Sequence, residues 1–201
     1  MLKLPESIQE AIDELSSLPS IGPRQATRII LHLATRYRAG AVRLARALSG
    51  ITAVKVCERC NFIHQEDGEL CSICADPGRD KKIIMVLEKE TDLMSMERAG
   101  KYTGSYFVLG DVPKTGIFEK EQKRQLEHLK EILEGLPGGM ANEVILAFNP
   151  TSHGDFAAET VLRELAGLSR EFSRLGRGLP TGGEIEFADP DTLAGSLDRR
   201  K

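Results

Sequence analysis

The feature that most constrains the fold of this chain is its set of four cysteines, which are Cys57, Cys60, Cys71 and Cys74. They form two C-x-x-C pairs separated by ten residues, and this spacer includes the turn-forming run 66–69. Each pair places two thiolates on one tight turn, and two facing turns supply the tetrahedral sulfur set of a structural zinc site. Four sulfurs leave no open position on the ion. The pattern therefore predicts one structural zinc per chain and no zinc catalysis.

Two other uses of the cysteines compete with zinc binding. A disulfide framework suits an oxidising compartment, but residues 1–6 lack the long apolar core of a signal peptide. A thioredoxin-like dithiol normally stands alone beside a βαβ unit, whereas the pairs are doubled here. We therefore expect reduced cysteines in a protein of the cytosol.

Length and hydropathy leave the domain count open. A chain of 201 residues with 41% hydrophobic residues can form one large domain or two small ones. No apolar run approaches the roughly 20 residues that cross a bilayer. We expect no membrane partner.

The charges are distributed unevenly along the chain. A net charge of −3 alone argues against nucleic-acid binding, but residues 16–56 contain no aspartate or glutamate. A basic stretch without acids is the electrostatic pattern of a surface that binds phosphate. We predict that the six arginines of this stretch contact DNA, namely Arg24, Arg28, Arg36, Arg38, Arg43 and Arg46.

A helical hairpin is predicted near the start of the chain, with its turn and its second helix in the basic stretch. Apolar residues at helical spacing indicate one helix over residues 6–15 and another that begins at Pro23, after a turn at Gly22. Proline suits the first helical position, and the N–H groups that follow it can bind a phosphate. A further helix is expected to end at Gly50, followed by a strand over 51–56 that leads into the first cysteine pair.

The segment from Leu18 to Ala26 resembles the helix-hairpin-helix motif, L-P-G-I-G-x-x-x-A. The resemblance implies that Arg24 and Arg28 face DNA. Ser20 replaces the first glycine of the motif, and serine tolerates a positive φ poorly, so the turn is expected to be reshaped. The competing interpretation is a plain helical hairpin without DNA affinity.

The second half of the chain alternates strand and helix patterns. Strands are predicted over 82–87, 106–109 and 143–148. Helices are predicted over 91–99 with Thr91 as its cap, over 119–134, and through 157–165. A short polar segment and a glycine-rich turn then lead to Glu184–Phe187 and a last helix over 191–199. This order implies a small parallel sheet with helices on its faces.

Acidic residues follow the first strand of the predicted sheet. Glu88 ends this strand and Asp92 lies on the next helix, a combination that resembles a Toprim domain. In that domain a D-x-D pair after a later strand helps the glutamate hold Mg²⁺. Here Asn149-Pro150-Thr151 stands at that place, and only Asp155 follows nearby. Because a single carboxylate binds Mg²⁺ poorly, we predict no catalytic metal site and no catalytic residue.

The order of hairpin, cysteine pairs, Toprim-like sheet and glycine-rich tail over 178–189 resembles the RecR family of bacterial recombination mediators across nearly the whole chain. The expected fold class is therefore α+β and multidomain. The expected parts are a helical domain with the helix-hairpin-helix at 1–53, a four-cysteine zinc finger at 54–77, a Toprim-like α/β domain with a parallel sheet at 78–174, and a C-terminal strand and helix segment at 175–201.

The resemblance implies a non-enzymatic DNA clamp, in which several copies form a dimer or a tetrameric ring. The hairpins would line the ring and bind gapped, single-stranded or double-stranded DNA. An acidic Toprim surface made of Glu88, Asp92 and Asp155 would dock RecO-like and RecF-like partners that help load recombinase. The expected location is cytoplasmic and nucleoid-associated.

Two alternatives of different classes remain open. One is a Toprim-type nuclease or primase that uses Glu88 with Mg²⁺, against which the absent D-x-D pair argues. The other is a zinc-dependent protein-interaction module without DNA affinity, for which the acid-free stretch would be only a solvated helical face. Binding to DNA at two salt concentrations separates the second alternative from the clamp.

Overall fold

The computed structural model describes residues 3–198 and 200. The chain divides into two compact units with the boundary between Val54 and Lys55. The first unit is helical, and the second contains the cysteines, a parallel sheet and the C-terminal tail. The mixed α+β class predicted from the sequence is confirmed. In the described part of the chain, no helix combines the length and apolar character that a membrane span requires.

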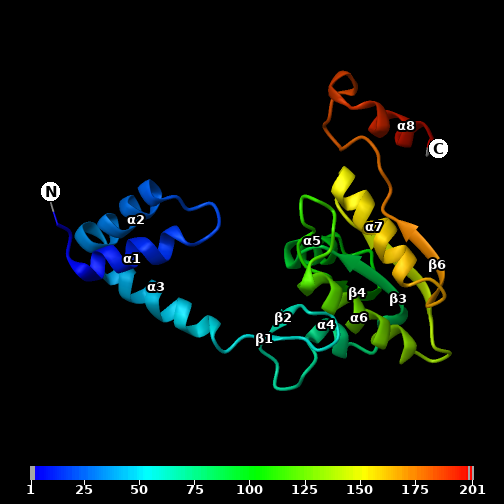
Figure 1. Cartoon of the computed structure of the whole chain (residues 1–201), viewed down its shortest axis with the longest axis horizontal. Helices are drawn as coiled ribbons and strands as arrows, with labels where there is room; N and C mark the ends of the chain where they lie inside the picture. Colours follow the sequence, from blue (N-terminus) through cyan, green and yellow to red (C-terminus); the bar gives the residue numbers. More distant parts are fainter. Residues whose placement is uncertain (1–2, 199, 201) are drawn as a thin grey trace. The chain divides into compact units, whose positions relative to one another are not determined.

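The N-terminal unit consists of the three helices α1 (Glu6–Ser16), α2 (Pro23–Arg36) and α3 (Arg38–Ile51) (Figure 1). Pro23 occupies the first turn of α2 and Gly22 precedes it as the N-cap, as the sequence predicts. Few side chains of this unit are buried, among them Ile12 of α1 and Ala26 of α2. The predicted end at Gly50 is wrong by one residue, because α3 continues to Ile51.

The α3 helix is followed by a turn and then by a strand much shorter than predicted. Strand β1 covers only Lys55–Val56 and pairs antiparallel with β2 (Ile63–His64). The predicted strand over 51–56 is wrong because Thr52, Ala53 and Val54 donate turn hydrogen bonds to the carbonyl groups of Ser49, Gly50 and Ile51. These turn bonds at the end of the helix replace the extended backbone that β-branched residues favour.

The second unit is built on a four-stranded parallel sheet in the order β4-β3-β5-β6. Its strands are β3 (Asp80–Leu87), β4 (Gly104–Val108), β5 (Ala141–Ala147) and β6 (Ser169–Arg174). The sheet's helices are α5 (Glu90–Ala99), α6 (Lys120–Glu134) and α7 (Ser152–Glu164), and the short α4 (Ser72–Ala75) precedes β3. The predicted strands β3, β4 and β5 are confirmed, with ends shifted by one or two residues.

Two hydrophobic clusters cover the two faces of the sheet (Figure 1). On one face, Leu129 of α6 and Val161 of α7 pack against Val86 and Phe107. On the other face, Leu93 of α5 packs with Met85 and Tyr106. Because both faces are covered, β3 and β5 are nearly continuous apolar runs, as expected for strands buried in a parallel sheet.

Three expectations for the second unit are corrected by the structure. The polar segment after α7 contains the edge strand β6, whose half-exposed sequence lacks an apolar run. The N-cap of α5 is Lys89, and Thr91 lies inside the helix. In the tail, a 3₁₀ turn at Ile185–Phe187 replaces the expected strand, and neither sheet in the described part of the chain includes this segment.

The last helix, α8, covers Pro190–Asp198. The side chain of Asp189 accepts hydrogen bonds from the backbone N–H and the hydroxyl of Thr192, which fixes the helix start. The predicted end of this helix at Arg199 lies outside the described residues.

Candidate metal centre and nucleic-acid interface

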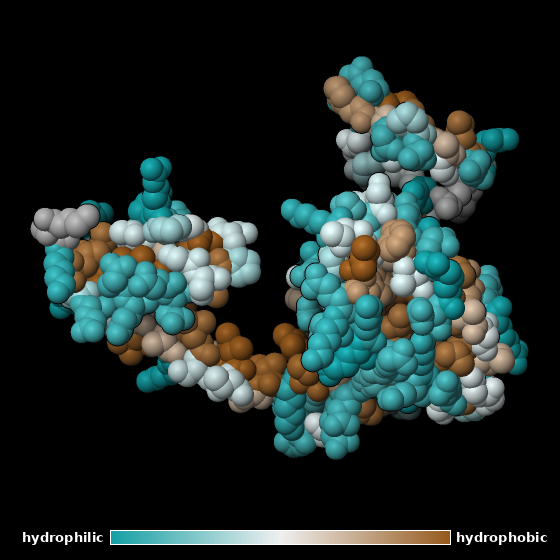
Figure 2. Space-filling model, viewed as in Figure 1, coloured by the Kyte–Doolittle hydropathy of each residue, from teal (hydrophilic) through white to brown (hydrophobic). Residues whose placement is uncertain are grey.

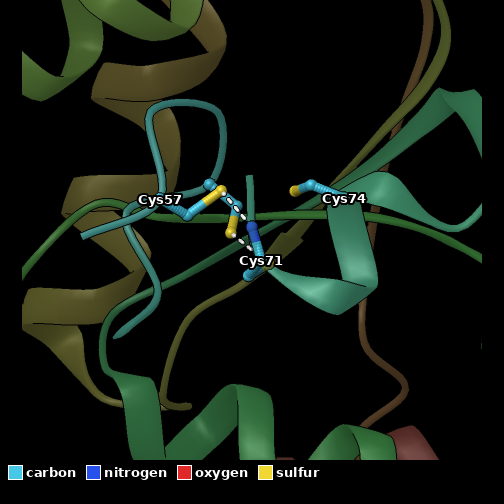
Figure 3. Close-up of side chains that lie close together, drawn as sticks. Cys57, Cys71 and Cys74 are labelled. Atoms are coloured by element: carbon cyan, nitrogen blue, oxygen red, sulfur yellow. Dashed lines mark hydrogen bonds between the residues drawn. The ribbon is translucent and has the colours of Figure 1, made fainter. Parts of the chain in front are cut away.

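The four cysteines converge in the second unit. Their sulfur atoms all lie within 4.8 Å of one another, and all four residues are buried and free of disulfides. The Sγ atoms of Cys60 and Cys71 are 3.6 Å apart, and the backbone N–H of Cys71 donates to the Sγ of Cys57 over 3.3 Å. Figure 3 shows this second contact, with Cys74 pointing toward it from α4.

Backbone hydrogen bonds close the tight turn of the first C-x-x-C pair. The N–H of Asn61 donates to the carbonyl of Cys57, and the N–H of Cys57 donates to the carbonyl of Phe62. Asn61 adopts a φ of 60°, in the left-handed region that asparagine tolerates better than most residues. The second pair is held by α4, which begins between Cys71 and Cys74.

The donor set fits a tetrahedral metal ion. With metal–sulfur bonds of about 2.3 Å, the sulfurs of a zinc tetrahedron lie about 3.8 Å apart. The 3.6 Å separation of Cys60 and Cys71 matches this value, and small shifts would bring the remaining pairs to it. The four cysteines can therefore hold a metal ion, as the sequence predicts.

The close sulfurs also influence one another's protonation. Contact with the Cys60 sulfur lowers the pKa of the Cys71 thiol, and the same contact raises the pKa of the Cys60 thiol. A divalent cation would stabilise all four thiolates, because it places positive charge at their centre.

The six predicted DNA-binding arginines lie in the N-terminal unit, and all are exposed. Arg24 and Arg28 stand one turn apart on α2 and therefore share one face of this helix. Within the described residues, none of the six forms an ion pair with a carboxylate. The first turn of α2 contains no acidic residue either. The positive charges of these six guanidinium groups are thus not paired with carboxylates in the described part of the chain.

Two of these arginines make contacts within the unit. The Nε of Arg38 donates to the carbonyl of Ala34 at the end of α2. The guanidinium of Arg43 lies over the ring of Tyr37, 5.2 Å from its centre, and also donates to its hydroxyl. These contacts orient the two side chains but leave their charge exposed. Arg38 and Arg43 therefore differ from Arg24 and Arg28, for which the described residues show no such contact.

The three predicted partner-binding acids lie near the carboxyl ends of β3 and β5, in different environments. Glu88 is only 7% exposed, and its carboxylate accepts the N–H of Asn149 over 2.7 Å. Asp92 is partly buried on α5, and burial raises the pKa of its carboxyl, with the charge of Glu88 acting in the same direction. Asp155 of α7 is paired with Arg174 and with Arg177.

An open hollow of about 510 Å³ lies at this edge of the sheet. It is lined by Asp92 and Asp155, by Arg174 and Arg177, and by tail residues that include Thr192. Among the described residues, the four cysteines are the one group of three or more metal-binding side chains that come close together. The acids at the sheet edge therefore do not converge on a common point.

Sequence reasoning missed several residues that shape these sites. Arg174 falls in the segment interpreted as polar and Arg177 in the glycine-rich turn after it, where two isolated arginines gave no distinct signal. Asn61 has a second role, because its side chain donates to the carbonyl of Val108 and to Gln125. Its sequence signal was only that asparagine is common in left-handed turn positions.

Comparison with known proteins agrees with this arrangement. Family models match residues 8–52 as "RecR, helix-hairpin-helix", residues 82–175 as "Toprim domain" and residues 178–201 as "RecR, C-terminal". Curated relatives match over nearly the whole length. A recombination protein RecR of Roseiflexus castenholzii is 40% identical, over 98% of this chain and 95% of the relative. The chain belongs to the RecR family.

Other RecR proteins show the same extent of similarity. The recombination protein RecR of Thermus thermophilus is 40% identical, over 100% of this chain and 99% of its own length. That of Chloroflexus aggregans is 40% identical, over 96% and 93%. The resemblance to the RecR family, its helix-hairpin-helix and its Toprim domain is therefore confirmed. The roles of individual residues remain predictions.

Proposed function

We propose that this protein is a DNA-binding recombination mediator in recombinational repair. It would act as a non-enzymatic clamp that, with RecO-like and RecF-like partners, helps load recombinase on gapped or single-stranded DNA. The observation that carries this proposal is the set of exposed arginines in the helix-hairpin-helix that have no carboxylate partner among the described residues, with Arg24 and Arg28 on one face at the start of α2. Such a surface binds phosphate without reading base sequence, as a mediator on varied DNA requires.

The metal proposed for the four cysteines is zinc, with one ion per chain. Four thiolates in tetrahedral reach are typical of structural zinc, which stabilises a fold and offers no open position to a substrate. Such an ion would hold the two C-x-x-C turns together, because it would take two sulfur ligands from each turn. The proposed role is structural.

The non-enzymatic proposal rests on the environment of Glu88. Its carboxylate is buried and accepts the backbone N–H of Asn149, so it fixes the loop that follows β5. Among the described residues, Glu88 belongs to no group of three or more side chains placed to hold a metal ion together. Phosphoryl transfer of the Toprim type requires carboxylates that hold Mg²⁺ together.

Self-association is proposed from the surface of α3. Four large apolar side chains of this helix are exposed, namely Val42, Leu44, Leu48 and Ile51. Figure 2 shows brown, apolar surface along this helix. Leu44, Leu48 and Ile51 recur at helical spacing and share one face of α3, and an apolar helix face left open in a small helical unit indicates an interface. We propose that a second copy covers it, in a dimer or a tetrameric ring.

The partner-facing surface is proposed at the acidic end of the sheet, around Glu88, Asp92 and Asp155. A basic partner would reach Asp155 only by displacing Arg174 and Arg177, since both arginines already contact its carboxylate. Asp92 has fewer contacts than Asp155, because its carboxylate accepts only the N–H of Lys89 among the described residues. The proposed location of the protein is the cytoplasm, in association with the nucleoid.

The test of the central proposal is a DNA-binding measurement at several salt concentrations. Replacing both Arg24 and Arg28 by alanine is expected to weaken binding to gapped DNA without unfolding the protein. The slope of log affinity against log salt should become shallower by about one unit for each lost phosphate contact. A matched control replaces Arg98 and Arg163, two exposed arginines of the second unit, by alanine. Unchanged affinity and slope in the Arg24 and Arg28 variant would refute this DNA surface.

A further inference from the structure

An exposed aromatic side chain stands at the junction between α2 and α3, within the basic stretch. Tyr37 separates the two helices, is flanked by Arg36 and Arg38, and is 47% exposed. The other two tyrosines of the chain, Tyr102 and Tyr106, lie in the second unit and pack against one face of the sheet. Of the three tyrosines, only Tyr37 therefore presents its ring to solvent in a basic environment.

The ring of Tyr37 is held in place by its neighbours. It lies so close to the backbone of Gly40 that a side chain at this position would overlap the ring. The guanidinium of Arg43 donates to its hydroxyl and lies 5.2 Å from the ring centre, within cation–π range. The ring of His32 lies on another side, with the two ring centres 6.3 Å apart. A ring fixed in this way loses little conformational entropy when a ligand stacks on it.

This ring lies at the end of the helix face that is proposed to bind DNA. Arg24, Arg28 and His32 follow one another at intervals of four residues, so each side chain lies one turn of α2 beyond the last. The next ring beyond His32 is that of Tyr37. The row thus leads from guanidinium groups that suit phosphates to an exposed aromatic ring that does not.

The chemistry of this end of the row fits an unpaired nucleobase. Every base has a flat π face, and single-stranded nucleic acid is commonly bound by stacking such faces on aromatic side chains and guanidinium planes. In a duplex the faces of the bases are already stacked on one another, and exposing one costs a few kcal/mol. Arg36 and Arg38 place positive charge beside Tyr37, where the phosphates of a stacked nucleotide would lie.

We propose that Tyr37, with Arg43 and His32 beside it, is a stacking site for an unpaired base of single-stranded DNA. The inference rests on the proposed function and deepens it. The arginines bind the backbone of any DNA, and Tyr37 favours its single-stranded part. A protein with this site holds the single strand of a gap more tightly than the flanking duplex. The plainer role of Tyr37, which is to close the turn between the helices against Gly40, predicts no such preference.

The experiment compares the affinity of the purified full chain for one oligonucleotide, single-stranded and in duplex with its complement. In Tyr37→Leu, affinity for the single strand is expected to fall about tenfold or more, the scale of stacking on an aromatic ring, while duplex affinity stays unchanged. The salt dependence of single-strand binding should keep its slope, because a stacked base releases no counterions. Tyr37→Phe keeps the ring and should bind like the wild type. Phe156→Leu alters an equally exposed aromatic residue of the second unit and is the matched control.

A second arm of the experiment removes the bases instead of the ring. An oligonucleotide of abasic sites keeps its phosphates but has nothing to stack, so the wild type and Tyr37→Leu should bind it equally. Tyr37→Trp supplies a fluorophore in a chain that has no tryptophan. Its emission is expected to change on binding the normal single strand, whereas the abasic strand should leave it nearly unchanged.

The two proposals fail in different ways. If Tyr37→Leu keeps the wild-type preference for the single strand, or loses affinity for single strand and duplex alike, the stacking site is refuted and the DNA surface of Arg24 and Arg28 stands. A wild-type chain that binds neither form of DNA would refute the proposed function itself. Should Tyr37→Leu fail to fold, the comparison of normal and abasic strands on the wild type and Tyr37→Trp decides, and equal binding and equal emission with both strands would exclude stacking.

Discussion

A single backbone position shows how the hairpin departs from its motif. Ser20 stands where the helix-hairpin-helix pattern has glycine, and it adopts a φ of 66°. For a residue other than glycine, this backbone conformation costs roughly 1–2 kcal/mol of conformational free energy. The hairpin therefore retains the left-handed turn of the motif and carries the strain on a serine. The sequence predicted a reshaped turn, whereas the structure keeps the positive φ.

The first prediction concerns this strain. Ser20→Gly is expected to stabilise the helical unit by about 0.5–1 kcal/mol, because relief of the positive φ outweighs the larger entropy of glycine in the unfolded chain. Ser20→Val should destabilise it by at least about 1 kcal/mol, since β-branched residues are outliers at positive φ. Thermal unfolding followed by far-ultraviolet circular dichroism measures both. Equal stability of the glycine and valine variants would contradict the argument.

At the scale of elements, the first C-x-x-C turn is joined to the outer edge of the sheet. The N–H of Val108, at the end of edge strand β4, donates to the carbonyl of Cys60, and Asn61 donates to the carbonyl of Val108, both over 2.9 Å. Phe62 and Ile73 pack against both the cysteines and the sheet. The metal centre thus covers an edge that would otherwise expose unpaired backbone groups.

The second prediction follows from this junction. Asn61→Gly keeps the left-handed backbone but removes two side-chain hydrogen bonds, each contributing about 1 kcal/mol. Hydrogen exchange at the amide of Val108 should accelerate about tenfold or more, since 1.4 kcal/mol corresponds to a factor of ten. Asn61→Ala should accelerate exchange further, because alanine tolerates the positive φ less well. The reverse order of the two variants would refute the role assigned to the backbone of Asn61.

The elements that could be predicted were those with a strong local signal. The apolar runs of β3 and β5, the charged amphipathic α6 and the proline at the start of α2 were all correct. The edge strand β6 was missed because its residues are half exposed and mostly polar, with Phe172 as its one apolar residue, so it contains no apolar run. Contacts between distant segments, such as Asn61 with Val108 or Asp155 with Arg177, depend on the tertiary fold and left no pattern in the sequence. The cysteine cluster was predictable because metal-ligand spacing is local.

At the scale of the whole molecule, the proposed clamp requires more than one copy of the chain. On one face of α3, Leu48 is 53% exposed and Ile51 is 60% exposed, in a unit with few buried side chains. Burying one such side chain fully contributes about 1.5–3 kcal/mol, and each copy presents several of them. Their repetition along one helix is a more specific indication than a single exposed apolar residue.

The third prediction tests this surface through the molecular mass of the protein in solution. Light scattering of the wild-type protein is expected to give a multiple of the 22.1 kDa chain mass. Leu48→Asp should shift the mass toward that of one chain, because a buried charge without a partner opposes association. Ile117→Asp, at an exposed apolar position of the second unit, is the matched control and should leave the mass unchanged. A wild-type protein with the mass of one chain, with and without gapped DNA, would exclude the ring.

The last prediction separates the clamp from a Toprim enzyme. The wild-type protein, incubated with nicked, gapped and supercoiled DNA and Mg²⁺ or Mn²⁺, is expected to show no cleavage, relaxation or primer synthesis. Glu88 is buried against the loop that holds Asn149, so Glu88→Gln should loosen this loop and weaken partner attachment while DNA affinity stays unchanged. Glu159→Gln, which alters an exposed carboxylate of α7 paired with Arg174, is the control for a general loss of negative charge. An activity that is present in the wild type and the control but absent in Glu88→Gln would establish the enzyme alternative, since it would require a metal-bound carboxylate at this position.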